Sequence, residues 1–195
     1  KRQVLVLADG LTGQMMEPIE WHEIPHRELP PKDWATTGKH GRSHPNFVTS
    51  LFIDPNDCDE MNQRLARKYA LITEKEIRYE AKDCEDAEVV LVAYGTPARV
   101  VLSAIEELRR QGVKAGLFRP ITLWPFPEKQ LHDLAGEDHV KVVVDVEMSL
   151  GQMIDDVRLA VEGQKPVKFA GVAGGLIPTV EDIVEAAKNA LKEAE

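Results

Sequence analysis

The sequence has few of the residues and motifs from which a self-contained catalytic site is built. Its two cysteines, Cys58 and Cys84, stand 26 residues apart without a C-x-x-C pair. This spacing argues against an iron–sulfur cluster bound wholly within the chain and favours two reduced thiols over a disulfide. We also find no G-x-G-x-x-G fingerprint, P-loop, nucleophile elbow or Ser-His-Asp order. Local motifs therefore assign no catalytic residue.

Long apolar runs and excess positive charge are missing as well. The longest runs, such as residues 89–93, have the length of a strand, far below the roughly 20 residues of a membrane helix. The net charge of −9 and the pI near 5.2 argue against a nucleic-acid surface or an anionic membrane as partner. There is no signal peptide and no initiator Met, and residues 3–8 begin as though mid-domain. We expect a cytoplasmic fragment of a longer protein.

From about residue 84 the hydrophobic pattern alternates between strands and helices. Expected strands cover 89–93, 113–118, 140–146 and 167–172, and expected helices cover 97–111, 128–135, 150–162 and 179–194. Connections this short require parallel strands joined by right-handed crossovers. We therefore predict an α/β fold, a mostly parallel sheet flanked by helices, with residues 84–195 as one complete domain.

The first 83 residues have a different character. Residues 4–8 are a continuous apolar run, typical of a strand buried on both faces, and 11–17 resemble a short helix stopped by Pro18. Residues 18–56 are rich in proline and histidine, which indicates an extended arm, and 57–82 show a charged helical pattern. We divide the chain into an N-terminal part with its arm (1–56), a linker helix (57–83) and the α/β domain (84–195).

The segment Arg119 to Pro127 is the most unusual stretch of the chain. Its three prolines fix three φ angles and remove three backbone donors, so it should be neither helix nor inner strand. Trp124 and Phe126 between these prolines predict a rigid apolar turn that packs tightly where the chain leaves the sheet.

Two strand-to-helix turns carry candidate polar contacts. Thr96 can cap the helix after the first strand of the domain, with Pro97 at its first position, and an anion at that helix end is the weaker alternative. Ser149 and Gln152 fit a capping box, while Glu147 beside them stays open as a partner or ligand contact.

Three further features have plain structural explanations. Thr179 with Asp182 fits a helix cap. The pairs His22/His26 and His40/His44 have the spacing of metal ligands on a helix, but proline and glycine within them argue against helical structure and hence against a metal site.

Several segments resemble the α subunits of 2-oxoacid:ferredoxin oxidoreductases, especially the branched-chain (2-oxoisovalerate) type. The resemblance covers essentially the whole chain in order. It lies in residues 7–18, 47–55, 76–80, 93–99, 119–127 and 147–152. Ser149 departs from the family pattern, in which Asn is expected.

The resemblance implies an enzyme that decarboxylates a 2-oxoacid on thiamine diphosphate and passes electrons through iron–sulfur clusters to ferredoxin and the acyl group to coenzyme A. It implies that a β subunit holds the diphosphate with its magnesium ion. It also implies γ- or δ-type subunits and a hetero-oligomer. Residues 1–20 would be the end of the pyrimidine-binding domain, and 84–195 would resemble the C-terminal domain of transketolase, which serves scaffolding and subunit contact.

The resemblance assigns no catalytic residue and no metal ligand, because the matching positions are absent from this sequence. As fold or interface positions near the coenzyme A side it suggests Gly95, Thr96, Arg99, Arg119, Thr122 and Gln152. We expect no cofactor within this chain and no turnover by the chain alone. The alternatives are a non-catalytic interaction module, a domain that binds an anion or coenzyme A, and 2-oxoglutarate as the substrate of the complete enzyme.

Overall fold

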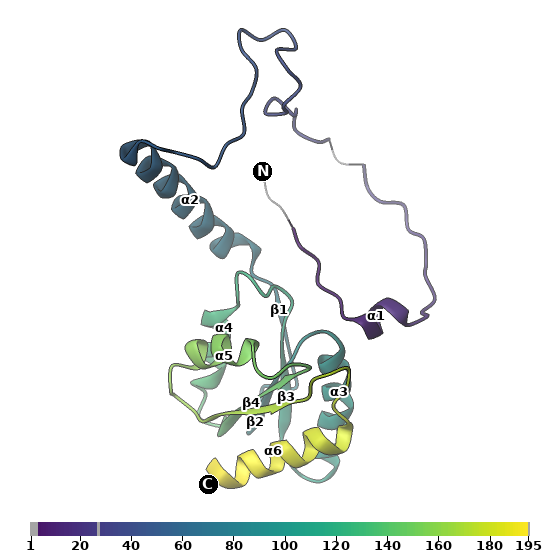
Figure 1. Cartoon of the computed structure of the whole chain (residues 1–195). Helices are drawn as coiled ribbons and strands as arrows, with labels where there is room; N and C mark the ends of the chain where they lie inside the picture. The colour runs from purple at the N-terminus through teal and green to yellow at the C-terminus, as the bar shows by residue number, and fades with distance from the viewer. Residues whose placement is uncertain (1–3, 27, 195) are drawn as a thin grey trace. The chain divides into compact units, whose positions relative to one another are not determined.

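The computed structural model describes residues 4–26 and 28–194 and contains one five-stranded sheet (Figure 1). The strand order is β1-β3-β2-β4-β5, in which β2 to β5 run parallel and β1 pairs antiparallel with β3. The predicted α/β class with a mostly parallel sheet is confirmed. The strands are β1 (Tyr79–Lys82), β2 (Val89–Val92), β3 (Ala115–Pro120), β4 (Val142–Glu147) and β5 (Val167–Gly171).

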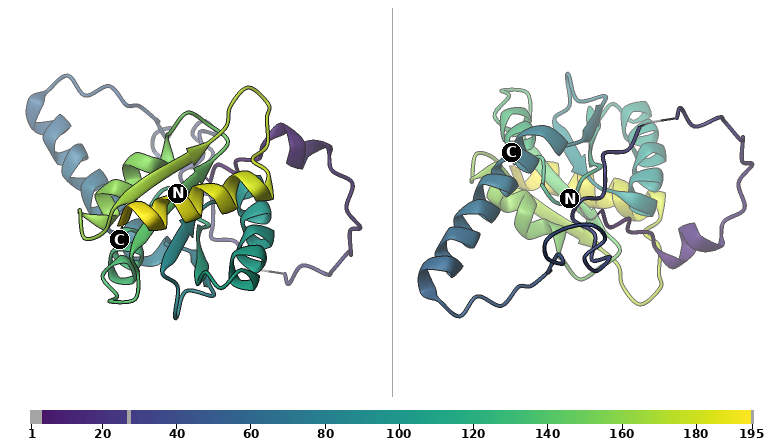
Figure 2. Two further views of the ribbon diagram at one scale, coloured as in Figure 1. Left: turned by 90° about the horizontal axis from the view of Figure 1, so that it is seen from below. Right: turned by 90° about the horizontal axis from the view of Figure 1, so that it is seen from above.

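Helices cover both faces of this sheet. Helices α3 (Gly95–Arg110) and α6 (Val180–Ala194) lie side by side on one face, as Figure 2 shows. Helices α4 (Glu128–Ala135) and α5 (Met153–Val161) pack on the other face. Successive side chains of a strand point to opposite faces, so β4 contributes Val142, Val144 and Val146 to the first apolar layer and Val143 to the second.

The expected linker helix over 57–83 is wrong at its C-terminal end. Helix α2 covers Pro55–Glu76, and the chain then turns into the edge strand β1. The Tyr79 ring stacks on the buried Phe118 ring with their centroids 5.3 Å apart, and Glu80 pairs with Arg119. Pairing with the open side of β3 therefore outweighs the helical spacing of these residues.

The expected strand at residues 4–8 is also wrong. This stretch forms no strand, and the side chains of Val4 to Leu7 are 65–84% exposed. A strand needs a neighbour for its backbone groups, and none is paired with this run in the described part of the chain. The short helix after it, α1 (Gly10–Gln14), is capped by Asp9, whose Oδ1 accepts from the Thr12 N–H at 2.7 Å.

Two compact units divide the chain. One comprises Lys1–Met15 together with Leu71–Glu195, and the other comprises Met16–Ala70. The second unit is an irregular arm followed by most of α2, and α2 has no buried residue. The sheet and the sites described below belong to the first unit.

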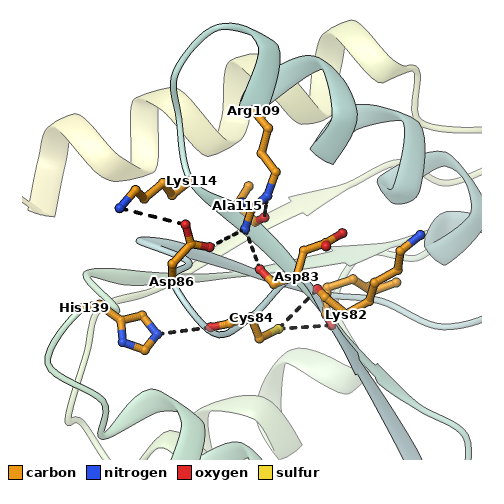
Figure 3. Close-up of polar contacts among 9 residues, drawn as sticks. Lys82, Asp83, Cys84, Asp86, Arg109, Lys114, Ala115 and His139 are labelled. Carbon is orange, nitrogen blue, oxygen red and sulfur yellow. Dashed lines mark hydrogen bonds and ion pairs between the residues drawn. The ribbon is translucent and has the colours of Figure 1, made fainter.

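Arg109, in the last turn of α3, holds the loop between β1 and β2 against β3 (Figure 3). Its Nε donates to the Ala115 carbonyl at 2.8 Å, and its Nη2 donates to the Asp83 carbonyl at 2.6 Å and to Asp86 Oδ1 at 2.7 Å. A ring nitrogen of His139 lies 3.1 Å from the Cys84 carbonyl on the same loop. One guanidinium thus satisfies two backbone acceptors where the chain enters the parallel sheet.

The prediction for the proline-rich segment is partly wrong. Strand β3 is an inner strand and extends through Pro120, which pairs with Tyr79 of β1. Pairing between β3 and β2 ends at Phe118, so the missing donor of Pro120 lies beyond the β2 ladder. Phe126 is buried as expected, whereas the Trp124 side chain is 62% exposed.

Candidate functional site

The candidate site lies at the carboxyl ends of β2 and β4. The chain continues from β2 to β3 on one side and from β4 to β5 on the other, so the strand order reverses between β2 and β4. In open parallel sheets, ligands bind in the crevice outside the strand ends at such a point. The first turns of α3 and the turn after β4 carry four of the six candidate positions, Gly95, Thr96, Arg99 and Gln152.

On the β2 side, α3 begins at Gly95, whose φ of +60° is readily adopted only by glycine. The residue before the helix is Tyr94, and among the described residues no side-chain hydrogen bond is made at this N-cap. The predicted Thr96 cap is therefore wrong, and Pro97 occupies the third helical position instead of the first. Thr96 is buried, with its hydroxyl oxygen 3.3 Å from that of Thr12.

The segment around α1 contacts the first turns of α3. The pKa of Asp9 is lowered chiefly by the hydrogen bond from the Thr12 N–H and then by one from the Thr96 hydroxyl. Arg99 Nη1 lies 3.6 Å from the Met15 sulfur. Two of the candidate residues, Thr96 and Arg99, thus contact this chain's own N-terminal segment.

On the β4 side, Glu147 organises the turn that leads into α5. Its carboxylate accepts from the N–H groups of Gln152 (3.1 Å to each oxygen) and Ile154 (3.0 Å) and from the Ser149 hydroxyl (2.8 Å). The predicted capping box of Ser149 and Gln152 is wrong, because α5 begins at Met153 and Gln152 makes no side-chain cap. The cap comes from a carboxylate that precedes the helix by six residues and reaches it only through the tertiary fold.

A second carboxyl group, Asp145, is fully buried two residues before Glu147. Burial, a hydrogen bond with Glu147 and the negative charge of Glu147 raise the pKa of Asp145 to about 9. Burial also opposes the ionisation of Glu147, but its hydrogen bonds outweigh that cost and lower its pKa. The pKa of Tyr94 is raised by burial and by the charges of Glu147 and Asp145. Asp145 was not among the residues singled out from the sequence. An acidic residue between the valines of β4 was the one sign that a carboxyl group would be buried there.

The other two candidates, Arg119 and Thr122, bond to the β1 side of the sheet. Arg119 Nη1 lies 3.1 Å from a carboxylate oxygen of Glu80. The Thr122 hydroxyl accepts from the Arg78 N–H at 3.0 Å and donates to the Arg78 carbonyl at 3.3 Å. Both residues fasten β1 to the segment after β3.

Metal-binding side chains do not gather in the described residues, where no group of three or more His, Cys, Asp or Glu could hold an ion. The segment His22 to His26 spells H-E-x-x-H, but it contains Pro25 and is not helical, so its two histidines lack the helical placement that this zinc motif requires. Cys58 and Cys84 are both free. Since an iron–sulfur cluster takes four cysteine ligands as a rule, these residues do not fit one. Among the described residues, no helix is long and apolar enough to cross a membrane.

Comparison with known proteins reveals the relatives of this chain. Residues 87–183 match the family model of pyruvate:ferredoxin oxidoreductase core domain II. The ketoisovalerate oxidoreductase subunit VorB of Methanothermobacter marburgensis is 41% identical over 184 residues, which are 94% of this chain and 51% of that protein. The chain belongs to the 2-oxoacid:ferredoxin oxidoreductase family. The resemblance stated from the sequence is confirmed.

More distant members of the family also align. The 2-oxoglutarate synthase subunit KorA of Methanocaldococcus jannaschii is 30% identical, over 94% of this chain and 55% of its own length. This oxidoreductase-family chain thus spans about half the length of the curated relatives it matches.

Two solved structures share the fold. The first is a 2-oxoglutarate:ferredoxin oxidoreductase from Magnetococcus marinus with 2-oxoglutarate, coenzyme A and succinyl-CoA bound. It matches with a TM-score of 0.57 and 20% identity, over 79% of this chain and 26% of its own. The second, a split-gene transketolase in an inactive β4 tetramer, matches with a TM-score of 0.51 and 23% identity, over 60% of this chain and 42% of its own. The predicted transketolase C-terminal-like fold is confirmed.

Proposed function

We propose that this chain is part of the α subunit of a thiamine-diphosphate-dependent 2-oxoacid:ferredoxin oxidoreductase and that it serves subunit assembly rather than chemistry. The complete enzyme would convert 2-oxoisovalerate to its acyl-CoA. The observation that carries this proposal is the 41% identity to a ketoisovalerate oxidoreductase subunit over 94% of the chain. Identities of 30% and 39% to two 2-oxoglutarate synthase subunits, over 94% and 93% of this chain, keep 2-oxoglutarate as the alternative substrate.

Exposed apolar side chains in the first 53 residues support an assembly role. A monomer rarely presents so many large apolar side chains over one stretch, and such stretches mark surfaces that another polypeptide covers. The side chains most exposed include Val4, Leu5, Val6, Met16, Trp21, Ile24, Phe47 and Ile53. We infer that the N-terminal part, the predicted remnant of a pyrimidine-binding domain, is completed by polypeptide that this chain does not contain.

The cofactors of the proposed enzyme would belong to other parts of the complex. The sequence lacks the G-D-G…N-N motif that holds thiamine diphosphate with magnesium, and its two cysteines do not fit a cluster. The proposed partners are a β subunit, γ- or δ-type subunits, ferredoxin and coenzyme A. A cytoplasmic location agrees with two thiols that are free in the structure.

Reconstitution tests this proposal. The purified chain would be assayed for coenzyme A-dependent oxidation of 2-oxoisovalerate, 2-oxoglutarate and pyruvate, alone and after coexpression with its β, γ and δ partners and the remaining α-subunit polypeptide. We expect no turnover by the chain alone and turnover of 2-oxoisovalerate by the assembly. Acyl-CoA formation by the isolated chain would overturn the assembly role, and a preference for 2-oxoglutarate would overturn the substrate.

A second candidate function is binding of an anion such as coenzyme A at the amino end of α3. The N-terminus of a helix at the carboxyl edge of a parallel sheet favours negative charge, and Arg99 lies one turn along that helix. Calorimetric titration of the chain with coenzyme A, with Arg99→Ala as the variant, tests it. Absence of binding at millimolar concentration would remove this candidate.

A further inference from the structure

Strand β4 carries two acidic residues, Asp145 and Glu147. They lie two positions apart on one strand, so both side chains point to the face covered by α4 and α5, the face to which Val143 contributes. Their residues are 0% and 2% exposed. Two carboxyl groups this deeply buried on one face cannot both carry a full charge without a large cost.

Their hydrogen bonds differ in kind. Glu147 accepts from the backbone of Gln152 and Ile154 and from the Ser149 hydroxyl, which is the environment of a carboxylate. Neither oxygen of Asp145 receives a hydrogen bond from any donor in the described part of the chain. An ionised Asp145 would therefore be a buried charge without a partner, whereas a protonated Asp145 becomes a donor itself.

We propose that Asp145 and Glu147 hold one proton between them, with Asp145 as the neutral acid that donates to the Glu147 carboxylate, and that this proton positions the turn Met148–Gln152 at the carboxyl edge of the sheet. Asp145 keeps the proton that an exposed aspartic acid would release at neutral pH, and no other bond is formed or broken. Glu147 is then free to hold the amino end of α5 with its remaining lone pairs.

The surroundings of the pair agree with this assignment. The positive charge of Arg158, on α5, lowers the pKa of Asp145. Burial and Glu147 raise this pKa by more, so the net shift is upward. The other ionisable groups close to the pair are Tyr94 after β2 and Asp156 on α5, and the pKa of each is raised, in both cases chiefly by burial. On the neighbouring strands, Asp145 is aligned with Val92 of β2 and Phe169 of β5, which are apolar.

The shared proton would hold the exposed turn after β4 in one place. Leu150 at its tip is 87% exposed, and Gly151 has a φ of +104°. Such a turn has little apolar packing of its own, so the hydrogen bonds to Glu147 must fix it. Asp145 is in these terms a positioning residue, because it acts on the turn only through Glu147. Nothing in this inference depends on the proposed enzymatic function.

The direct test is carbon-13 NMR of the full chain labelled at the aspartate side-chain carboxyl carbon. We expect the Asp145 signal at pH 7 to have the chemical shift of a carboxylic acid and to move to that of a carboxylate near pH 9. A signal at the carboxylate position at pH 7 would overturn the proposal. The backbone connectivities assign this signal in the unsubstituted chain, so the measurement does not require a variant that folds.

The second test is the pH dependence of stability in Asp145→Asn, which keeps the shape and supplies an amide donor that does not titrate. Because the folded-state pKa of Asp145 is raised, the urea midpoint of the unsubstituted chain should fall as the pH rises from about 5 to about 8. The midpoint of Asp145→Asn should stay nearly constant over that range. The matched control is Asp138→Asn, which removes an exposed acid from the loop before β4. Its urea midpoint should fall with rising pH as steeply as that of the unsubstituted chain. Equal slopes in all three chains would overturn the proposal.

Discussion

Arg109 and Asp86 are joined by a 2.7 Å ion pair between the last turn of α3 and the loop before β2. The same guanidinium donates to the carbonyls of Asp83 and Ala115, so one side chain connects a helix, a loop and the first residue of β3. This arrangement joins the loop before β2 to the start of β3. It lies at the edge opposite the carboxyl ends, and we regard it as structural.

We expect Arg109→Gln to lower the free energy of unfolding by about 1–3 kcal/mol, because the Ala115 carbonyl and the Asp86 carboxylate lose part-buried hydrogen bonds to a charged donor. Urea denaturation followed by circular dichroism measures the change. The neighbouring Arg110, which is 74% exposed, supplies the control, and Arg110→Gln should change stability by less than about 0.5 kcal/mol. Equal losses in the two variants would contradict the role of Arg109.

Gly116 of β3 is expected to tolerate no side chain. A Cβ at this position would lie 2.5 Å from the Asp83 carbonyl oxygen and 2.9 Å from the Cys84 Cα, both backbone atoms that cannot move aside alone. Gly116→Ala should therefore destabilise the fold by about 1–3 kcal/mol or prevent it from folding. Gly13→Ala, where the added Cβ meets nothing within 4 Å, is the control. Thermal unfolding that gave the same midpoint for both variants would refute the expectation.

The two cysteines should differ in reactivity. Cys84 is buried, and desolvation together with the nearby Glu85 charge raises its pKa to about 12, so the thiolate is scarce at neutral pH. Cys58 lies on α2, where it is partly exposed. We expect one thiol to react quickly with a disulfide reagent at pH 7.5 and the second only after denaturation. Cys58→Ser should abolish the fast phase; a fast phase that survived would show that Cys84 is accessible.

Thr179 and Asp182 form the reciprocal cap that the sequence predicted at the start of α6, with the Asp182 N–H 3.1 Å from the Thr179 hydroxyl and the Thr179 N–H 3.1 Å from Asp182 Oδ2. Thr179→Ala should lower the free energy of unfolding by about 1 kcal/mol, because α6 loses this cap. Hydrogen bonds from Thr179 lower the pKa of Asp182. The ionised Asp182 therefore stabilises the folded chain above the ordinary pKa of aspartate, and this stabilisation is lost as the pH falls through the lowered pKa of the folded state.

The acid branch of the stability curve measures this effect. Asp182→Asn should show a shallower loss of stability between about pH 4 and pH 2 than the unsubstituted chain. Glu181→Gln, on the same first turn, serves as the control for charge. If the two variants had the same acid branch, the cap would not be the source of the pH dependence.

Most of the α/β domain could be predicted from hydrophobic periodicity. The expected helix over 128–135 has the observed bounds, and the expected strand over 167–172 differs by one residue. Runs of Val and Leu with short connections admit few arrangements other than a parallel sheet. The cap of α6 was also predictable, because its two partners are three residues apart.

The candidate site was predicted less well, because its hydrogen bonds join distant residues. Thr96 has the right spacing for a cap, yet its hydroxyl lies beside Thr12, 84 residues away in the sequence. Ser149 and Gln152 have the spacing of a capping box, yet it is the Glu147 carboxylate that caps α5 by accepting from the Ile154 N–H. Periodicity also could not show that Tyr79–Lys82 would leave the helical pattern, since that depends on the open edge of β3.

The sequence by itself determined the class of fold, the order of strands and helices from residue 84 onward, and the family, because these depend on local periodicity and on motifs read along the chain. Only the tertiary structure decided which face Asp145 and Glu147 share, what Arg109 holds, and that residues 4–8 lie exposed and pair with no strand among the described residues. The physical reason is that burial and hydrogen-bond partners arise between segments, so a carboxyl group acquires its protonation state only when the sheet and helices have enclosed it.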